Sequence, residues 1–463
     1  MKIFALDENN FKDLPTNKLL YGWLLLAVLA LGFAGIFAFM IALARTPVIE
    51  GFMPMGRDYI YVGLVGHVIL AFVLWFLAFE GFLWVYSTTY YAGRAVQSPL
   101  VGWASLFFSS TGVALVVVSA IAGLGRAELA NYVPVLLTPV FYSALLIFAL
   151  GILLNLLNAF IAILRFYKEV RRGGGRLPPL TLGMGAAGLS VIVAFICFGL
   201  SGYFQYSTGK EGLDFERLFW AGGHILQFVN TISVVTVWAC LARITMGKAP
   251  LGAASSRALY LVYLAFVIPA PFIYLLYDTS SMQYKDSFTF LMSWGLGPST
   301  GIFIAAIIYL IWKEKSMPLK RPGFSSMVLS MAVFTLGGVI SMRIRGVNTI
   351  IPAHYHSEIG GITIAFMGLF YEVLPAVKRQ IHWPRLAAVQ PYLYFSGILL
   401  FVIGFYVAGA HGAMRKTYAG AQNLESIGRF LGLALMGFGG VVSIAGGAAF
   451  VLNSLVTLLG KKS

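Results

Sequence analysis

The stretch IPAHYHSEIGG, residues 351–361, places two histidines one residue apart inside a long apolar segment. The chain holds only six histidines among 463 residues, and an ionisable side chain within a membrane is costly and usually functional. Two positions along an α-helix correspond to a rotation of about 200°. His354 and His356 therefore point in nearly opposite directions, and they are suited to bind two different centres on the two sides of one helix.

The composition around this stretch is that of a membrane protein. The chain is 59% hydrophobic and only 11% charged, which is too little charge for the surface of a soluble domain. A membrane span needs about 20 mostly apolar residues. The twelve spans that we predict cover residues 19–45, 59–86, 100–124, 132–165, 180–205, 216–243, 257–278, 286–312, 323–345, 352–377, 388–411 and 425–459. We expect one polytopic domain, 19–463, after a polar cytoplasmic segment, 1–18.

The net charge of +15 has a topological explanation. If the N-terminus is cytoplasmic, most of the 32 Lys and Arg residues fall on the inner side, as the positive-inside rule requires. This distribution argues against nucleic acid as a partner and leaves membrane lipid as the surroundings. We expect a multi-pass protein of a bacterial or archaeal cytoplasmic membrane.

Four histidines share the outer half of the membrane in this topology. His67 and His224 each lie eight residues after the start of a predicted span, which is about 12 Å below its outer end. His354 and His356 lie near the outer start of a third span. A single histidine there can simply hydrogen-bond a neighbouring helix. Four at similar depth favour a shared function, and imidazole is the usual axial ligand of haem.

The motifs around these histidines resemble subunit I of the haem-copper oxidase superfamily, which includes oxygen reductases and nitric oxide reductases. The sequence has GH at 66–67, GGH at 222–224 and HYH at 354–356. The run 353–377 resembles the family's tenth helix, and AGAHGAMRKTYAG, 408–420, resembles the segment between its last two helices. The resemblance implies an all-α bundle of twelve transmembrane helices.

The same resemblance implies roles for the histidines. His67 and His356 would be the axial ligands of a low-spin haem. His354 would be the proximal ligand of a high-spin haem on the other side of the helix, and His224 would bind a second metal, copper or non-haem iron.

Basic residues on the outer side are expected to receive the haem carboxylates. Arg415 and Lys416 match the family's basic pair, and carboxylates in a medium of low dielectric constant need such partners. Arg343 and Arg345 precede the HYH helix and could serve in the same way. Anchoring at the membrane interface is an equally good interpretation of Arg343 and Arg345.

The sequence departs from the family at the second metal. The family has two adjacent histidines in its seventh helix, where this chain has Ala270 and Pro271. Phe228 stands where oxygen reductases of the commonest type have a tyrosine and nitric oxide reductases commonly have a glutamate. One imidazole cannot hold copper in the usual site of three histidines, so the second metal is doubtful.

Other polar residues are candidates for catalysis or proton transfer. Tyr274 is a polar group near the expected second-metal position, and Glu358 is a candidate outer-shell group or proton carrier. Glu80 and Glu372 lie deeper or at the inner ends of their spans. Each is either a proton relay or a carboxyl group paired with a basic residue.

We weigh three functions. The first is a respiratory gas reductase, in which electrons pass from the low-spin to the high-spin haem and reduce a diatomic gas. Nitric oxide is slightly favoured over oxygen because its two-electron reduction demands less of a weak second-metal site. The second is a non-catalytic di-haem subunit for electron transfer, or one linked to quinone. The third is a transporter without haem, since twelve helices are common there.

The electron donor must be another molecule or subunit. The two cysteines, Cys197 and Cys240, form no c-type haem motif and no binuclear copper site. A cytochrome c, a cupredoxin-like subunit or quinol is therefore the expected donor.

Overall fold

The structure is a computed structural model that describes residues 14–52, 54–130, 132–207, 212–315, 317–417, 421–422 and 424–460. Its elements, in chain order, are α1 Leu14–Ala44, η2 Ile49–Phe52, α2 Arg57–Ile69, η3 Leu70–Leu74, α3 Trp75–Thr88, α4 Pro99–Ile121, β1 Arg126–Glu128, β2 Val135–Leu137, α5 Pro139–Arg172, α6 Pro179–Ser207, α7 Phe215–Met246, α8 Ala253–Val267, η4 Ala270–Phe272, α9 Ile273–Leu276, α10 Met282–Glu314, α11 Pro322–Ser341, α12 Ile350–Val373, η5 Leu374–Val377, α13 Pro384–Ala410 and α14 Ile427–Leu459.

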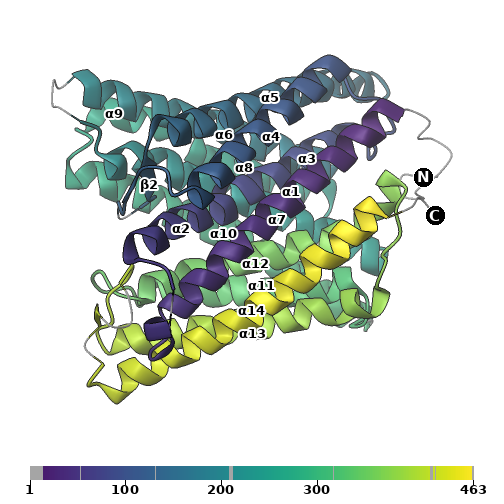
Figure 1. Ribbon diagram of the computed structural model, residues 1–463. Coiled ribbons are helices and arrows are strands. Elements are labelled where there is room, and N and C mark those ends of the chain that lie inside the picture. The colour runs from purple at the N-terminus through teal and green to yellow at the C-terminus, as the bar shows by residue number, and fades with distance from the viewer. Residues whose placement is uncertain are drawn as a thin grey trace.

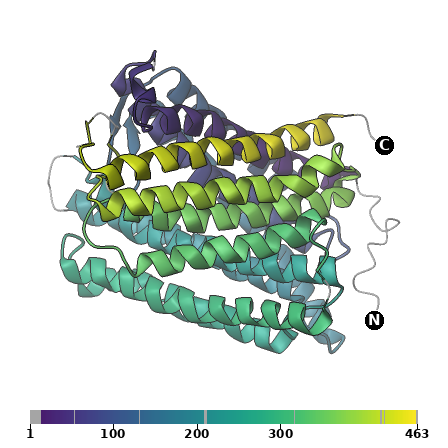
Figure 2. The ribbon, with the colours of Figure 1, turned by 90° about the horizontal axis from the view of Figure 1, so that it is seen from below.

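The helices form an antiparallel bundle with twelve candidate membrane spans in the described part of the chain. This confirms the all-α fold with twelve spans predicted from the sequence. Helix α1 begins and α14 ends at the same end of the bundle (Figures 1 and 2). We call this end the terminal side, and the opposite end, where α1 ends and α2 begins, the distal side.

The fourth span is displaced from its prediction. We expected 132–165, but the helix is α5, Pro139–Arg172. Residues 135–137 instead pair with residues 126–128 as a short antiparallel hairpin, and Pro139 takes the first helical turn, where its missing N–H costs nothing. The apolar run VPVLL before Pro139 was therefore wrongly read as helix.

The seventh span is interrupted. The predicted continuous segment 257–278 is divided into α8, the single turn η4 and the four-residue α9. Pro269 and Pro271 lie at the break, since proline lacks the backbone N–H that a continuous helix uses.

The start of the chain also differs from the prediction. Residues 1–13 of the expected cytoplasmic segment 1–18 lie outside the described residues. Helix α1 begins at Leu14, so residues 14–18 belong to the first span rather than to a polar extension.

Helix α3 is the centre of the bundle, and all of its residues are buried. It can lie close to α1 because a Cβ at Gly81 would come within 2.5 Å of the Trp23 ring. Asn155 of α5 donates a hydrogen bond to the Gly81 carbonyl group, and Phe79 stacks on Phe366 of α12 at 4.6 Å.

Helices α13 and α14 contact through glycines, and they run side by side in Figure 1. A Cβ at Gly404 would lie 2.3 Å from the backbone nitrogen of Met436, and one at Gly397 would lie 2.1 Å from that of Ser443. Such small residues let transmembrane helices pack backbone to backbone. This contact holds α14 in place as one wall of the cavity described below.

We predict opposite effects for one substitution at two glycines. Gly404→Ala should lower stability by about 1–3 kcal/mol, because the methyl group overpacks the α13–α14 contact. The matched control Gly301→Ala, on α10 with nothing within 4 Å, should be neutral or stabilising by up to about 1 kcal/mol. Thermal unfolding of the purified protein in detergent measures both, and equal transition temperatures would contradict the predicted contact.

Candidate haem site

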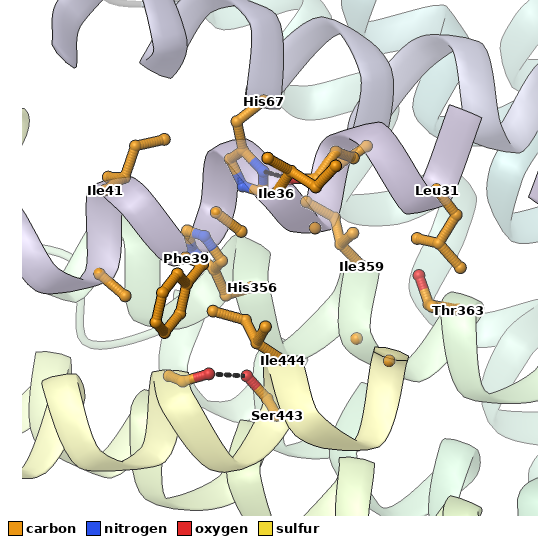
Figure 3. Close-up of a pocket in the computed structure, with 18 of the residues that line it drawn as sticks. Leu31, Ile36, Phe39, Ile41, His67, His356, Ile359, Thr363, Ser443 and Ile444 are labelled. Carbon is orange, nitrogen blue, oxygen red and sulfur yellow. Dashed lines mark hydrogen bonds between the residues drawn. The ribbon is translucent and has the colours of Figure 1, made fainter. Parts of the chain in front are cut away.

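A cavity of about 650 Å³ lies between α1, α2, α12, α13 and α14. This is within the range of roughly 300–1,000 Å³ typical of pockets that bury organic ligands. Its wall is mostly apolar, with Phe401 and Phe405 on one side. His67 and His356 both reach into it, and Figure 3 shows their rings pointing into the same space.

The two rings present the same nitrogen atom to the cavity. His67 Nδ1 lies 3.0 Å from the carbonyl oxygen of Ala34 on α1, and His356 Nδ1 lies 2.8 Å from that of Pro352. A carbonyl oxygen can only accept, so each Nδ1 carries the hydrogen. The lone pair is therefore on Nε2 in both rings, which is the arrangement that prepares histidine to bind a metal.

Local structure fixes where these rings stand. Helix α12 starts four residues before His354, and Thr349 at that start donates its hydroxyl hydrogen to the Phe405 carbonyl group. On the other wall, the π-helical turn Leu70–Leu74 follows His67 within the same span. Turns of this kind are rare and occur frequently at functional sites.

The cavity opens sideways toward the lipid-facing surface. Ile36 and Phe39 of α1 and Leu452 of α14 line it, yet they are 65%, 45% and 57% exposed. An apolar molecule can therefore reach the cavity from the membrane without crossing a polar surface.

Two cations, Arg45 and Lys416, stand on the cavity wall. Lys416 donates a hydrogen bond to the Ala130 carbonyl group. Burial, reinforced by Arg415 and Arg45, lowers the pKa of Lys416 to about 7, and burial also lowers the pKa of Arg45. This cluster of positive charge would be stabilised by an anion at the cavity mouth, as haem carboxylates would provide.

The predicted basic residues are thus placed unequally. Lys416 lines the cavity. Arg415 does not line it, but it is close enough to Lys416 to lower the pKa of that lysine. Arg343 and Arg345 are exposed and do not line this cavity. Arg45 was missed in the sequence, where the only signal was a cation at the end of the predicted span 19–45.

His354 faces away from the cavity. Its Nδ1 lies 2.9 Å from the carbonyl oxygen of Gly337 on α11 and 3.7 Å from Glu358 Oε1. His354 and His356 therefore contact different partners on different sides of α12. The 650 Å³ cavity does not extend to His354.

His224 is packed among aromatic rings. Its ring stacks on Tyr132 at 5.0 Å and lies 4.6 Å from the Trp220 ring, and its Nδ1 bonds the Trp220 carbonyl group at 2.6 Å. Gln227 holds Tyr132 through its hydroxyl group at 2.8 Å. Sequence reasoning missed Tyr132, because it was expected to begin the span 132–165, whereas it lies in the connecting segment before α5 and meets His224 only in the folded chain.

Tyr274 belongs to a neighbouring group of hydroxyls. Its oxygen is 2.7 Å from Ser201 Oγ and receives a hydrogen bond from Tyr284 at 3.1 Å. The Phe288 ring lies 6.3 Å from both the Tyr274 and the His224 rings, which places it between them. Tyr274 is therefore one ring removed from His224.

The residues fit a haem on one side of α12 and do not fit a second metal on the other. Two free Nε2 atoms, an apolar slot and two cations match a bis-histidine haem with its carboxylates. By contrast, the described residues contain no group of three His, Cys, Asp or Glu side chains that could hold a metal ion.

The sequence matches one family model and several bacterial proteins. A family model described as "Cytochrome C and Quinol oxidase polypeptide I" matches residues 18–443. An uncharacterised protein of Rickettsia prowazekii is 26% identical over 94% of this chain and 95% of its own length. Cytochrome c oxidase subunit 1 of Thermus thermophilus is 22% identical over 80% of this chain and 71% of its own length.

The fold has a solved counterpart. The cryo-EM structure of a heme-copper terminal oxidase dimer matches with a TM-score of 0.83 at 18% identity, over 97% of this chain and 85% of that chain. At this identity the match shows that the two chains share a fold.

We predict that His67→Leu and His356→Leu each lower the haem content by about one haem per chain, because a bis-histidine haem loses an axial ligand in either case. Pyridine haemochrome assays on purified protein measure the content. His382→Leu, at an exposed position, is the matched control and should keep all haem. Full haem content in either cavity variant would contradict the ligand assignment.

A second prediction concerns pH. Because burial lowers the pKa of Lys416 to about 7, Lys416 is already protonated below this pH. Above it, binding of a haem carboxylate must bring a proton along, so haem affinity should fall by up to about tenfold per pH unit.

Haem transfer from the protein to apomyoglobin, followed at pH 6 and pH 9, tests this dependence. Lys416→Met should hold haem more weakly at pH 6 and lose most of the difference between the two pH values. Arg345→Met, at an exposed position outside the cavity, should behave as the wild type. If haem affinity depends on pH in Lys416→Met as it does in the wild type, protonation of Lys416 is not the cause.

Proposed function

Because the chain belongs to the family of cytochrome c and quinol oxidase polypeptide I, the haem-copper oxidase subunit I family, we propose that it reduces a diatomic gas with electrons that enter at the His67–His356 cavity. The family makes it a multi-pass, haem-dependent membrane oxidoreductase. The haem ligands, the gas and the donor are the parts that we propose.

The observation that carries the proposal is the pair of Nε2 atoms in one apolar cavity. His67 and His356 come from different helices, yet each is oriented by a hydrogen bond to a backbone carbonyl group. A haem supplies reversible one-electron transfer and, where one axial position is open, a site for a diatomic gas. Arg45 and Lys416 would hold its carboxylates at the distal side.

His354 would bind the second, high-spin haem across α12. Its Nδ1 is oriented by Gly337 in the same way that the other rings are oriented, which leaves Nε2 as the ligand atom. Since His354 and His356 are two residues apart, electrons would cross a single helix. Glu358 lies one turn after His354, with its Oε1 atom 3.7 Å from His354 Nδ1. It would serve as a proton carrier beside this haem.

Nitric oxide is the favoured gas. The described residues offer no cluster for copper or non-haem iron, and His224 is enclosed by Tyr132 and Trp220. Reduction of oxygen to water takes four electrons and benefits from a second metal and a neighbouring redox-active side chain. Reduction of nitric oxide takes fewer electrons and demands less of such a site. Tyr132, which stacks on His224, and Tyr274, beyond Phe288, are the tyrosine hydroxyl groups on this side.

The same observation supports a second candidate. A chain that has lost the second-metal ligands could serve as a di-haem electron-transfer subunit, or as one linked to quinone. In that case both axial positions of each haem would be filled, and no gas would bind.

The donor and the setting complete the proposal. Cytochrome c, a cupredoxin-like subunit or quinol would supply the electrons, and quinol could approach through the lateral opening beside Ile36 and Phe39. The protein would lie in a bacterial or archaeal cytoplasmic membrane with its N-terminus in the cytoplasm, because most Lys and Arg residues then face inward.

Carbon monoxide binding distinguishes the two candidates. We predict that the reduced protein binds carbon monoxide at about one haem per chain, because a high-spin haem on His354 keeps an open axial position. His354→Leu should abolish this binding and retain the haem held by His67 and His356. Optical difference spectra and metal counts on the same samples measure both.

The numbers of haem, copper and non-haem iron per chain test the proposed gas reduction. We expect two haems per chain and no stoichiometric copper or non-haem iron, since the described residues hold no ligand cluster for one. Two haems without carbon monoxide binding would favour the electron-transfer subunit. One haem or none would overturn the assignment of His354 or of the whole site.

A further inference from the structure

Glu80 is a fully buried carboxyl group that the proposed chemistry has not yet used. It lies on α3 at 0% exposure, eight residues before the helix ends at the terminal side, which is about 12 Å. Among the described residues neither of its oxygens makes a hydrogen bond of ordinary geometry, and the nearest polar side chain is Ser233 of α7. Buried polar atoms are nearly always hydrogen-bonded in proteins, so this group needs an explanation.

Other polar atoms around α3 are in the same condition. Ser233 of α7 faces the carboxyl group, and its hydroxyl oxygen is likewise buried without a described partner. The indole nitrogens of Trp23 and Trp75 are also buried without a described partner, and the Trp23 ring packs on Gly81, next to Glu80 in the chain. Buried polar groups without protein partners are the kind that ordered water satisfies.

No charged group among the described residues forms an ion pair with Glu80. The residues on either side of it, Phe79 and Gly81, contact Phe366 of α12, Trp23 of α1 and Asn155 of α5, which are all uncharged. From α6 the nearby polar group is the Met184 carbonyl oxygen, which accepts from Trp84 of α3. From α7 it is Ser233. An isolated carboxylate in such surroundings is prohibitively costly, so Glu80 rests as the neutral acid.

Titratable groups lie between Glu80 and the terminal side. Tyr86 follows it on α3 and interacts electrostatically with Cys240 of α7, which in turn interacts with Glu372 and Arg243. Glu372 forms a two-pronged ion pair with the partly exposed Arg321, at 2.9 and 2.7 Å. Titratable side chains thus lie between the terminal surface and Tyr86, which is about 9 Å along α3 from Glu80.

From this geometry we infer that Glu80 is a proton carrier, which takes protons from the terminal side and passes them toward the haem side of the bundle. The inference rests on the proposed function, since reduction of either gas consumes one proton for each electron. The carboxyl group gives up its proton when an electron arrives from the donor. A proton from water at the terminal side then restores the acid, so Glu80 ends each cycle unchanged.

Infrared difference spectra of the holoprotein, oxidised against reduced, test this inference directly. The wild type should show a carboxylic-acid C=O band that changes on reduction and shifts in heavy water. Glu80→Gln should lose this band and turn over the gas at least about tenfold more slowly, with unchanged haem content. Ser233→Ala should shift the band and slow turnover to a smaller extent, and Glu80→Asp should restore part of the rate.

Glu169→Gln is the control, because this carboxylate is exposed and paired with Arg94; it should leave the band and the rate unchanged. If Glu80→Gln holds full haem, keeps the band and turns over at the wild-type rate, Glu80 is only a packed neutral acid. If the wild type holds haem but reduces no gas, the infrared band alone decides on Glu80. A wild type without haem would overturn the proposed function and this inference together.

Discussion

The hydrogen bond from an imidazole Nδ1 to a backbone carbonyl group is the interaction on which the distal half of this protein depends. Four histidines inside three of the spans make it, and the exposed His411 makes it at the end of α13. For the four, the acceptors are the carbonyl groups of Ala34, Trp220, Gly337 and Pro352. In surroundings without water each ring must satisfy one nitrogen within the protein, and doing so through backbone fixes which nitrogen remains for a metal. The glycines and the start of α12 serve to keep these rings in position.

The sequence predicted well the features that depend on neighbouring residues in the chain. Apolar length located twelve spans, and the rotation per residue predicted different sides of α12 for His354 and His356, which contact Gly337 of α11 and Phe401 of α13. What it missed depends on contacts between distant segments. Arg45 is only the last residue of a predicted span, 19–45, until α13 and α14 close the cavity beside it. Hydropathy also cannot distinguish an apolar β-strand from the first turns of a helix.

The two sides of α12 are built differently. On the His356 side, small residues and an apolar slot leave room for a large planar group. On the side of α7 and α8, Tyr132 and Trp220 enclose His224, and the helix that carries two metal-binding histidines in the wider family is broken at Pro269 and Pro271. Membership of the family removes the haem-free transporter from consideration. The residues on the His356 side match the proposed haem site more completely than those around His224 match a second-metal site.

The π-helical turn Leu70–Leu74 has a consequence for how this chain is compared with others. Each residue gained or lost in a helix rotates all that follows by about 100°, so the wide turn sets the angular phase between His67 before it and Glu80 after it. A homologue whose second span is wholly α-helical would therefore match this chain in two blocks separated by a single-residue gap. An ungapped alignment through the histidine would assign the wrong residue to the position of Glu80.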